Sequence, residues 1–263
     1  MKVNGSMRIR HSTWYRAPVT GIEADLRGSL GTVRNAVTLL HLLADGPPYQ
    51  HLTDLAEQSG LSVPTVHRLL RSLSLAGLVE QDTHSARYGL GPELVRFSHR
   101  YLARLPVLAA LSPYLPSVRD ALATSVQVAL YLRGSVAYVD RVEGADGALY
   151  REPHRIAPAL STAPGRMLAA RADDTAWTQA LARADEADRR TAAQRRGAWR
   201  SADHLALPVP GRGTIEVAVP VVDGSGRTAA ALVASVADED LVAKAAVELT
   251  RATSAAGRML GHA

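Results

Sequence analysis

The side chains best suited to binding chemistry gather in one short run of the chain. Between positions 62 and 72 they are Ser62, Pro64, Thr65, His67, Arg68, Arg71 and Ser72. An arginine can form two hydrogen bonds with the edge of a guanine, and a short hydroxyl can meet a base edge or a phosphate. These residue types therefore point to DNA contact, provided that one structural element presents them on a single face.

The apolar residues of the same run indicate a helix. Val66, Leu69, Leu70 and Leu73 have the i, i+3, i+4, i+7 spacing of a buried stripe. Ser62 stands where a helix N-cap is expected, Pro64 falls in the first turn, and Gly77 is expected to end the helix. Both arginines and the hydroxyls are then left on the solvent side.

A shorter helix is predicted just before this one, over residues 54–59. Thr53 is placed to cap its first free amides, and Gly60 can end it in the left-handed conformation. Together the two elements form a helix-turn-helix, whose second helix enters the major groove of DNA.

Two short strands are predicted after the second helix, over residues 78–82 and 87–90, around the polar turn 83–86. A hairpin beside such a helix is a wing, and Arg87 within it is a candidate for a phosphate contact. The alternative interpretation of residues 51–90 is an ordinary helical hairpin whose arginines are merely solvated.

The rest of the chain predicts the α+β class, an antiparallel sheet covered by helices. A helix over 92–105 places Leu94, Phe97, Tyr101 and Leu105 on one apolar side, which needs a partner. Two hairpins are expected, 126–132 with 136–142 and 214–222 with 227–236, together with an extended stretch at 149–151. Further helices are expected after Pro106 and over 164–172, 174–184, 186–196 and 239–261.

Composition adds several bounds. A length of 263 residues suggests two domains, and the absence of cysteine excludes disulfides and thiolate metal sites. Residues 1–105 hold 12 basic and 8 acidic side chains, a net charge of +4, whereas the remainder holds 18 and 17, a net charge of +1. Positive charge thus accompanies the part expected to meet phosphate. No apolar run approaches the roughly 20 residues that span a bilayer, so a cytoplasmic protein is expected.

The competing interpretation is an enzyme, but the sequence offers few candidate catalytic residues. His154, Ser161 and Asp140 could be assembled into a nucleophilic triad, but Ser161 lacks the Gly-x-Ser-x-Gly turn that exposes such a serine. No pair of histidines has metal-ligand spacing, and there is no glycine loop for a phosphate. We therefore expect no catalytic residues, no metal and no cofactor.

At three places the chain resembles the IclR-type transcriptional regulators. The first comprises Leu52–Leu61, Thr65–Leu73, Gly77–Glu80 and Arg87–Pro92, which look like that family's winged helix-turn-helix. The second is Ser161–Ala170, and the third is Val217–Asp223 with Gly226, Arg227 and Ala230–Ser235. The resemblance implies a DNA-binding domain joined by a linker helix to a domain that binds a small organic effector, in a chain that pairs as a dimer.

The resemblance also implies where the effector binds. The matching residues are Thr162, Ala163, Pro164 and Gly165, with Glu216, Val233 and Ser235 on the facing strands. A helix N-terminus at 162–165 would favour an anion. Two residues depart from the family: Glu216 stands where a small residue is frequent, and Val233 where a hydroxyl is common. Glu216 would repel a carboxylate unless Arg166 or another cation neutralises it, which favours a neutral or amine-bearing ligand. Alternatively, a shift of one residue in strand register turns Glu216 outward.

These observations predict a sequence-specific, DNA-binding transcriptional regulator, with repression as the expected direction. Its expected parts are a flexible arm (1–28), a winged helix-turn-helix (29–91), a linker helix (92–105) and an effector-binding domain (106–263). Its expected partners are a pseudo-palindromic double-stranded operator, a small-molecule effector, and further copies in a homodimer or homotetramer, with no membrane. The DNA-contact set comprises the residues named above between Ser62 and Ser72, with Thr53 and Arg87. The alternative is a winged-helix protein whose C-terminal domain is catalytic or only binds other proteins.

Overall fold

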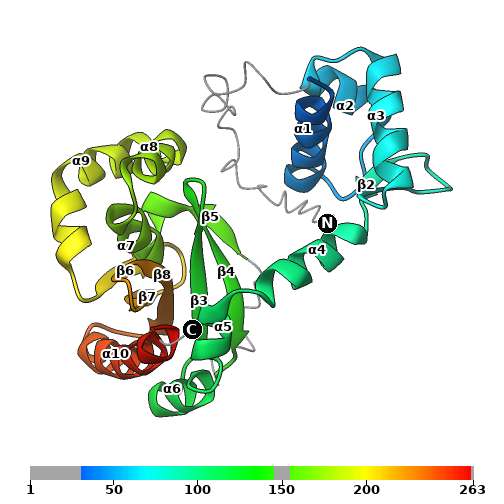
Figure 1. The fold of residues 1–263 in the computed structure, drawn as a ribbon. Helices are drawn as coiled ribbons and strands as arrows, with labels where there is room; N and C mark the ends of the chain where they lie inside the picture. The colour runs from blue at the N-terminus through cyan, green and yellow to red at the C-terminus, as the bar shows by residue number, and fades with distance from the viewer. Residues whose placement is uncertain (1–30, 145–154, 262–263) are drawn as a thin grey trace, which may run out of the picture. The chain divides into compact units, whose positions relative to one another are not determined.

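The computed structural model describes residues 31–144 and 155–261, which form two compact units that divide between His99 and Arg100 (Figure 1). The arm expected at 1–28, the extended stretch expected at 149–151 and His154 lie outside the described residues.

The first unit is three helices and a hairpin around one apolar core. Its elements are α1 (Gly31–Asp45), α2 (Leu52–Ser59), α3 (Val63–Leu75), β1 (Val79–Gln81) and β2 (Tyr88–Leu90). Leu39 of α1, Leu55 of α2 and Leu70 of α3 are fully buried against one another. The stripe predicted for α3 is therefore its core side. Gln50 adds a bridge to Tyr88 of the wing, which the sequence did not indicate.

The ends of α2 and α3 differ in part from prediction. Thr53 does not cap α2, because the helix begins two residues earlier than predicted, at Leu52, with His51 at the N-cap, and the Thr53 hydroxyl instead contacts Asp54. Gly60 ends α2 in the left-handed conformation, as predicted. Ser62 is the N-cap residue of α3, but its hydroxyl pairs with the hydroxyl of Thr65 at 2.8 Å rather than with a backbone amide.

Helix α4 (Glu93–Leu102) follows the wing, and none of its residues is buried. Phe97 is 49% exposed and Tyr101 is 55% exposed in the single chain. The apolar side predicted from sequence is therefore present and has no cover among the described residues. The helix ends at Leu102 rather than at residue 105, and Pro106 opens the next one.

The second unit is a six-stranded antiparallel sheet with helices on both faces (Figure 1). The strands lie in the order β5-β4-β3-β8-β7-β6. Their bounds are β3 (Val126–Leu132), β4 (Ser135–Val142), β5 (Ile156–Pro158), β6 (Leu205–Val209), β7 (Thr214–Val222) and β8 (Thr228–Val236). The helices are α5 (Pro106–Leu111), α6 (Leu115–Leu122), α7 (Ala163–Arg171), α8 (Asp174–Arg183), α9 (Glu186–Ser201) and α10 (Asp240–Leu260), and a 3-10 turn, η2 (Ala159–Ser161), precedes α7.

The central strands alternate between two apolar layers. Val217, Val219 and Val221 of β7 pack with α5, α6 and α10, while Ala218 packs with α7 on the opposite face. This alternation fixes the strand register, since a shift of one residue would exchange the two layers. The α+β class with a helix-covered antiparallel sheet is confirmed, and the edge strands β5 and β6 were not predicted.

Candidate functional sites

The exposed side of α3 carries the side chains predicted to meet DNA. His67, Arg68, Arg71 and Ser72 are exposed, as are Ser62 and Pro64 at the start of the helix, while Thr65 is half-buried. Within the described ranges neither Arg68 nor Arg71 has an acidic partner. Val66 and Leu70 on the opposite side are fully buried in the core, so the side of α3 that carries the arginines faces outward.

The wing is tied back to the start of α2. Arg87 donates from Nε to Nε2 of His51 at 3.1 Å, and the Tyr49 hydroxyl donates to Glu80 at 2.5 Å. At the wing turn, hydrogen bonds from Ser85 lower the pKa of Asp82 below its ordinary value. These contacts position Arg87 beside the helix-turn-helix. Thr53 is exposed in the first turn of α2.

In the second unit, the N-terminus of α7 is built tightly. The Thr162 hydroxyl caps the helix by accepting from the amide of Gly165 at 3.1 Å. A Cβ on Gly165 would stand 2.1 Å from the carbonyl oxygen of Ala159, so only glycine fits there. Thr162, Ala163, Pro164 and Gly165 are all buried, and Ala163 packs against apolar residues of the sheet.

Glu216 reaches this helix end from β7. It is 5% exposed, and its Oε2 accepts from the amide of Ala163 at 3.0 Å. Its Oε1 accepts from the Tyr138 hydroxyl at 2.5 Å. The outward orientation considered from the sequence is therefore wrong, because the register of β7 places residue 216 on the α7 side. The chain's own carboxylate stands where a helix N-terminus attracts an anion.

Burial and neighbouring charges both shift the pKa values of Glu216 and Tyr138. Burial raises the pKa of Glu216 above its ordinary value, while the Tyr138 hydrogen bond and the Arg155 charge lower it. Burial also raises the pKa of Tyr138 well above its ordinary value, and the neighbouring Glu216 carboxylate adds to the rise. Both contact atoms of Glu216 accept hydrogen bonds, which is the arrangement of an ionised carboxylate.

A small cavity of about 20 Å³ lies beside Glu216 on this face of the sheet. Three arginines from separate segments line it: Arg141 on β4, Arg155 just before β5, and Arg212 in the turn between β6 and β7. Its polar wall is completed by Gln127, Thr214 and Ser235, and Val209 also lines it. Of the residues expected to bind an effector, Glu216 and Ser235 line this cavity, while Val233 lies in the apolar layer under α7.

Arg166 is not the cation that neutralises Glu216. Its guanidinium donates to the Leu160 carbonyl at 2.7 Å and to Asp188 at 2.9 Å, and it lies over the ring of Trp199. The cations that face Glu216 are Arg155 and Arg212. Sequence reasoning missed them and Tyr138, because these residues are far apart in the chain and only the folded sheet brings them together.

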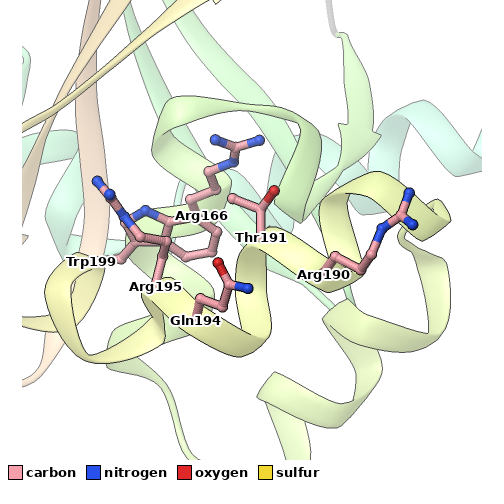
Figure 2. A pocket seen from close by; sticks show the side chains of 6 residues that line it. All are labelled: Arg166, Arg190, Thr191, Gln194, Arg195 and Trp199. Carbon is pink, nitrogen blue, oxygen red and sulfur yellow. The ribbon is translucent and has the colours of Figure 1, made fainter.

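A larger hollow of about 310 Å³ lies on α9, away from Glu216. It is lined by Arg166 of α7 and by Arg190, Thr191, Gln194, Arg195 and Trp199 of α9. Figure 2 shows the guanidinium groups of its three arginines pointing in different directions rather than toward a common point. This hollow is therefore an open basic surface without convergent groups.

Of the three groups considered for a catalytic triad, His154 lies outside the described residues, and the structure describes Asp140 and Ser161. Ser161 donates its hydroxyl proton to the Pro158 carbonyl at 2.9 Å. No group of three or more histidine or acidic side chains suited to a metal occurs among the described residues. None of the described helices is long and apolar enough to cross a membrane.

Comparison with known proteins supports this geometry. Residues 32–83 match the model of the IclR helix-turn-helix domain. This segment is similar to the IclR helix-turn-helix domain. It spans α1 to α3 and β1 apart from the first residue of α1, so the resemblance drawn from the sequence is confirmed for this part of the chain.

Relatives extend the match beyond the IclR domain. The glycerol operon regulatory protein of Streptomyces coelicolor is 33% identical over 62% of this chain and 62% of its own length. The Pca regulon regulatory protein of Pseudomonas putida is 28% identical over 70% of this chain and 67% of its own length. This chain thus spans about three fifths of the first relative. Both names are those of regulators rather than enzymes.

Solved structures show the same fold through both units. An IclR family transcriptional regulator from Brucella abortus aligns with a TM-score of 0.71 at 20% identity, covering 89% of this chain and 93% of that one. An IclR homologue from Microbacterium hydrocarbonoxydans, solved with 4-hydroxybenzoate, aligns with a TM-score of 0.67 at 20% identity, covering 87% and 98%. The fold of the IclR regulators therefore includes the sheet domain as well as the helix-turn-helix.

Proposed function

We propose that the chain is a sequence-specific DNA-binding transcriptional regulator whose affinity for DNA responds to a small molecule bound in the second unit. The observation that carries the proposal is the exposed side of α3, where Arg68 and Arg71 have no acidic partner in the described part of the chain and the helix is fixed by its buried stripe. In a helix-turn-helix the second helix reads base edges, while neighbouring residues contact phosphates.

The proposed DNA-contact set is Ser62, Pro64, Thr65, His67, Arg68, Arg71 and Ser72 on and around α3, with Thr53 on α2 and Arg87 in the wing. The proposed parts are the arm (1–28), the winged helix-turn-helix (29–91), the linker (92–105) and the effector domain (106–263). The division of the described chain between His99 and Arg100 falls inside the proposed linker, which supports a linker between two domains. The proposed location is the cytoplasm.

A dimer is part of the proposal. The apolar side of α4 has no cover from residues 31–144 and 155–261, and α1 adds Val33 and Val37, which are 58% and 44% exposed. A two-fold pair of helix-turn-helix units binds two half-sites related by the same symmetry. The operator is therefore expected to be pseudo-palindromic, and repression is the expected outcome where it overlaps a promoter.

The proposed effector site surrounds Glu216, with Thr162, Ala163, Pro164 and Gly165 at the start of α7 and with Val233 and Ser235 on β8. Support comes from the cavity and from the likeness in fold to an IclR homologue whose structure holds 4-hydroxybenzoate. No cofactor, metal or catalytic role is proposed.

The test is a titration of duplex DNA by fluorescence anisotropy, using the DNA that flanks the protein's own gene and a scrambled duplex of equal length. Arg68→Ala and Arg71→Ala are each expected to weaken specific binding by ~1–3 kcal/mol, since each would remove contacts to a base edge. Arg195→Ala on α9 is the matched control and should bind as the wild type does.

Unchanged affinity in both α3 variants would show that another face reads the DNA. If the wild type binds neither duplex, the alternative gains support, in which the winged helix only mediates association between proteins.

A further inference from the structure

We infer that the cavity beside Glu216 binds an anion that also carries a hydrogen-bond donor, such as a small hydroxy acid or amino acid. The anionic group would lie among Arg141, Arg155 and Arg212, and the donor would lie against Glu216. This inference rests on the proposed function, because it names the ligand class of the proposed effector site.

The charge of the cavity wall favours an anion. Three arginines and one glutamate line it, so its net charge is +2 with Glu216 ionised. Arg141 donates from Nη2 to Ser125 at 3.1 Å, and its buried Nε has no hydrogen-bond partner among the residues that the structure describes. A buried guanidinium nitrogen without a partner is costly, and an anionic ligand would satisfy it.

The position of Glu216 explains why a plain carboxylic acid is disfavoured. Its carboxylate already takes the amide of Ala163, so the end of α7 is not available to the carboxylate of a ligand. A second carboxylate placed there would meet a like charge at close range. The anion of a ligand must therefore lie on the arginine side of the cavity.

Glu216 also specifies the second group of the ligand. Each of its oxygens accepts one hydrogen bond, from Tyr138 and from Ala163, and a carboxylate oxygen can accept two. Acceptor capacity therefore remains beside the arginines. A hydroxyl or ammonium group on the ligand would use it and would separate the two negative charges.

The size of the cavity limits the ligand to a short chain. A volume of about 20 Å³ holds little more than one water molecule. Arg141, Arg155 and Arg212 are half-exposed, so the wall that they form can widen by side-chain rotation. The opposite wall is the sheet and the buried Glu216, which cannot yield in the same way.

Thermal unfolding of the full chain tests the inference with two size-matched sets of probes. One set is acetate, glycolate and glycine, and the other is butyrate, 4-hydroxybutyrate and 4-aminobutyrate. In at least one set, the hydroxy acid or amino acid is expected to raise Tm by about 5–10 °C at roughly one hundred times its Kd. The unsubstituted acid of that set should raise Tm by less than half as much.

Variants assign any response to the cavity. Arg212→Ala should lose at least tenfold in affinity for the active probe, and Glu216→Gln should respond equally to the substituted and unsubstituted acids. Arg195→Ala, in the separate hollow on α9, is the control and should respond as the wild type does.

The inference is overturned if no hydroxy or amino acid raises Tm, if the unsubstituted acids act equally well on the wild type, or if Arg212→Ala responds normally. Specific DNA binding is measured on the same protein without any probe. Intact DNA binding with a failed probe response therefore refutes the ligand class and leaves the proposed function standing.

Discussion

Among single residues, Glu216 has the largest effect on the chemistry of the cavity in the second unit. The sequence left two orientations open, and the sheet register selects the inward one, where the carboxylate meets the amide of Ala163. The resemblance to the family identified Glu216 as a residue that departs from the family's pattern. The sequence could not predict which residues surround Glu216, because Tyr138, Arg155 and Arg212 come from three different segments.

Replacing Glu216 by glutamine should change how stability depends on pH. Burial raises the pKa of the folded carboxyl above its unfolded value, so the folded state holds this proton more tightly than the unfolded state does. The free energy of unfolding should therefore fall as pH rises from the unfolded pKa through the folded pKa. Glu216→Gln lacks this ionisation, and its unfolding free energy should fall less over that interval.

Urea denaturation of both proteins at a series of pH values measures this effect. The difference between the two curves isolates Glu216 from other carboxyls, such as Asp223, whose pKa is lowered by hydrogen bonds from Ser225. Parallel curves would mean that Glu216 titrates alike in the folded and unfolded states.

Gly165→Ala should destabilise the chain although alanine favours helices. The gain in helix propensity is about 1 kcal/mol, whereas a Cβ 2.1 Å from the Ala159 carbonyl oxygen forces the backbone to shift, at a cost of about 1–3 kcal/mol or more. Gly197→Ala on α9 is the matched control, because a Cβ there meets nothing within 4 Å. Thermal unfolding should show a lower Tm for the first variant and a higher Tm for the second.

At the scale of elements, prediction from the sequence worked best where local signals agree. Gly60 correctly predicted the end of α2. The buried stripe of Val66, Leu69 and Leu70 correctly predicted α3. The start of α2 was misplaced because Thr53 has the right side chain for a cap, while the backbone of His51 takes that position. Strands β5 and β6 were missed because they have only 3 and 5 residues and lie at the sheet edges.

Helix α4 yields a prediction about assembly. If its apolar side is covered by a second copy, then Phe97→Asp buries a charge in that contact and should raise the dimer dissociation constant at least tenfold. His99→Asp places the same charge on the opposite side of the helix and serves as the control. Sedimentation velocity over a range of concentrations distinguishes the two; equal behaviour would place the interface elsewhere.

At the scale of the whole molecule, charge is distributed unevenly between the parts. The first 105 residues hold a net charge of +4 and the remainder +1, so DNA binding should weaken steeply with added salt. Arg87→Ala should reduce the slope of log K against log salt by about one and lower affinity for cognate and scrambled duplexes alike. Anisotropy titrations at several salt concentrations measure this, and a loss confined to the cognate duplex would instead assign Arg87 to base reading.

The carboxylate that closes the end of α7 also bears on how such regulators diverge. A single base change in a glutamate codon gives glycine or alanine, and either would uncover the Ala163 amide that Glu216 now occupies. Under the proposed function, gene copies that differ at this codon alone would keep the same α3 surface and therefore the same operator. They could nonetheless answer to different metabolites, so a duplicated gene could acquire a new signal in one mutational step while its target promoters stay unchanged.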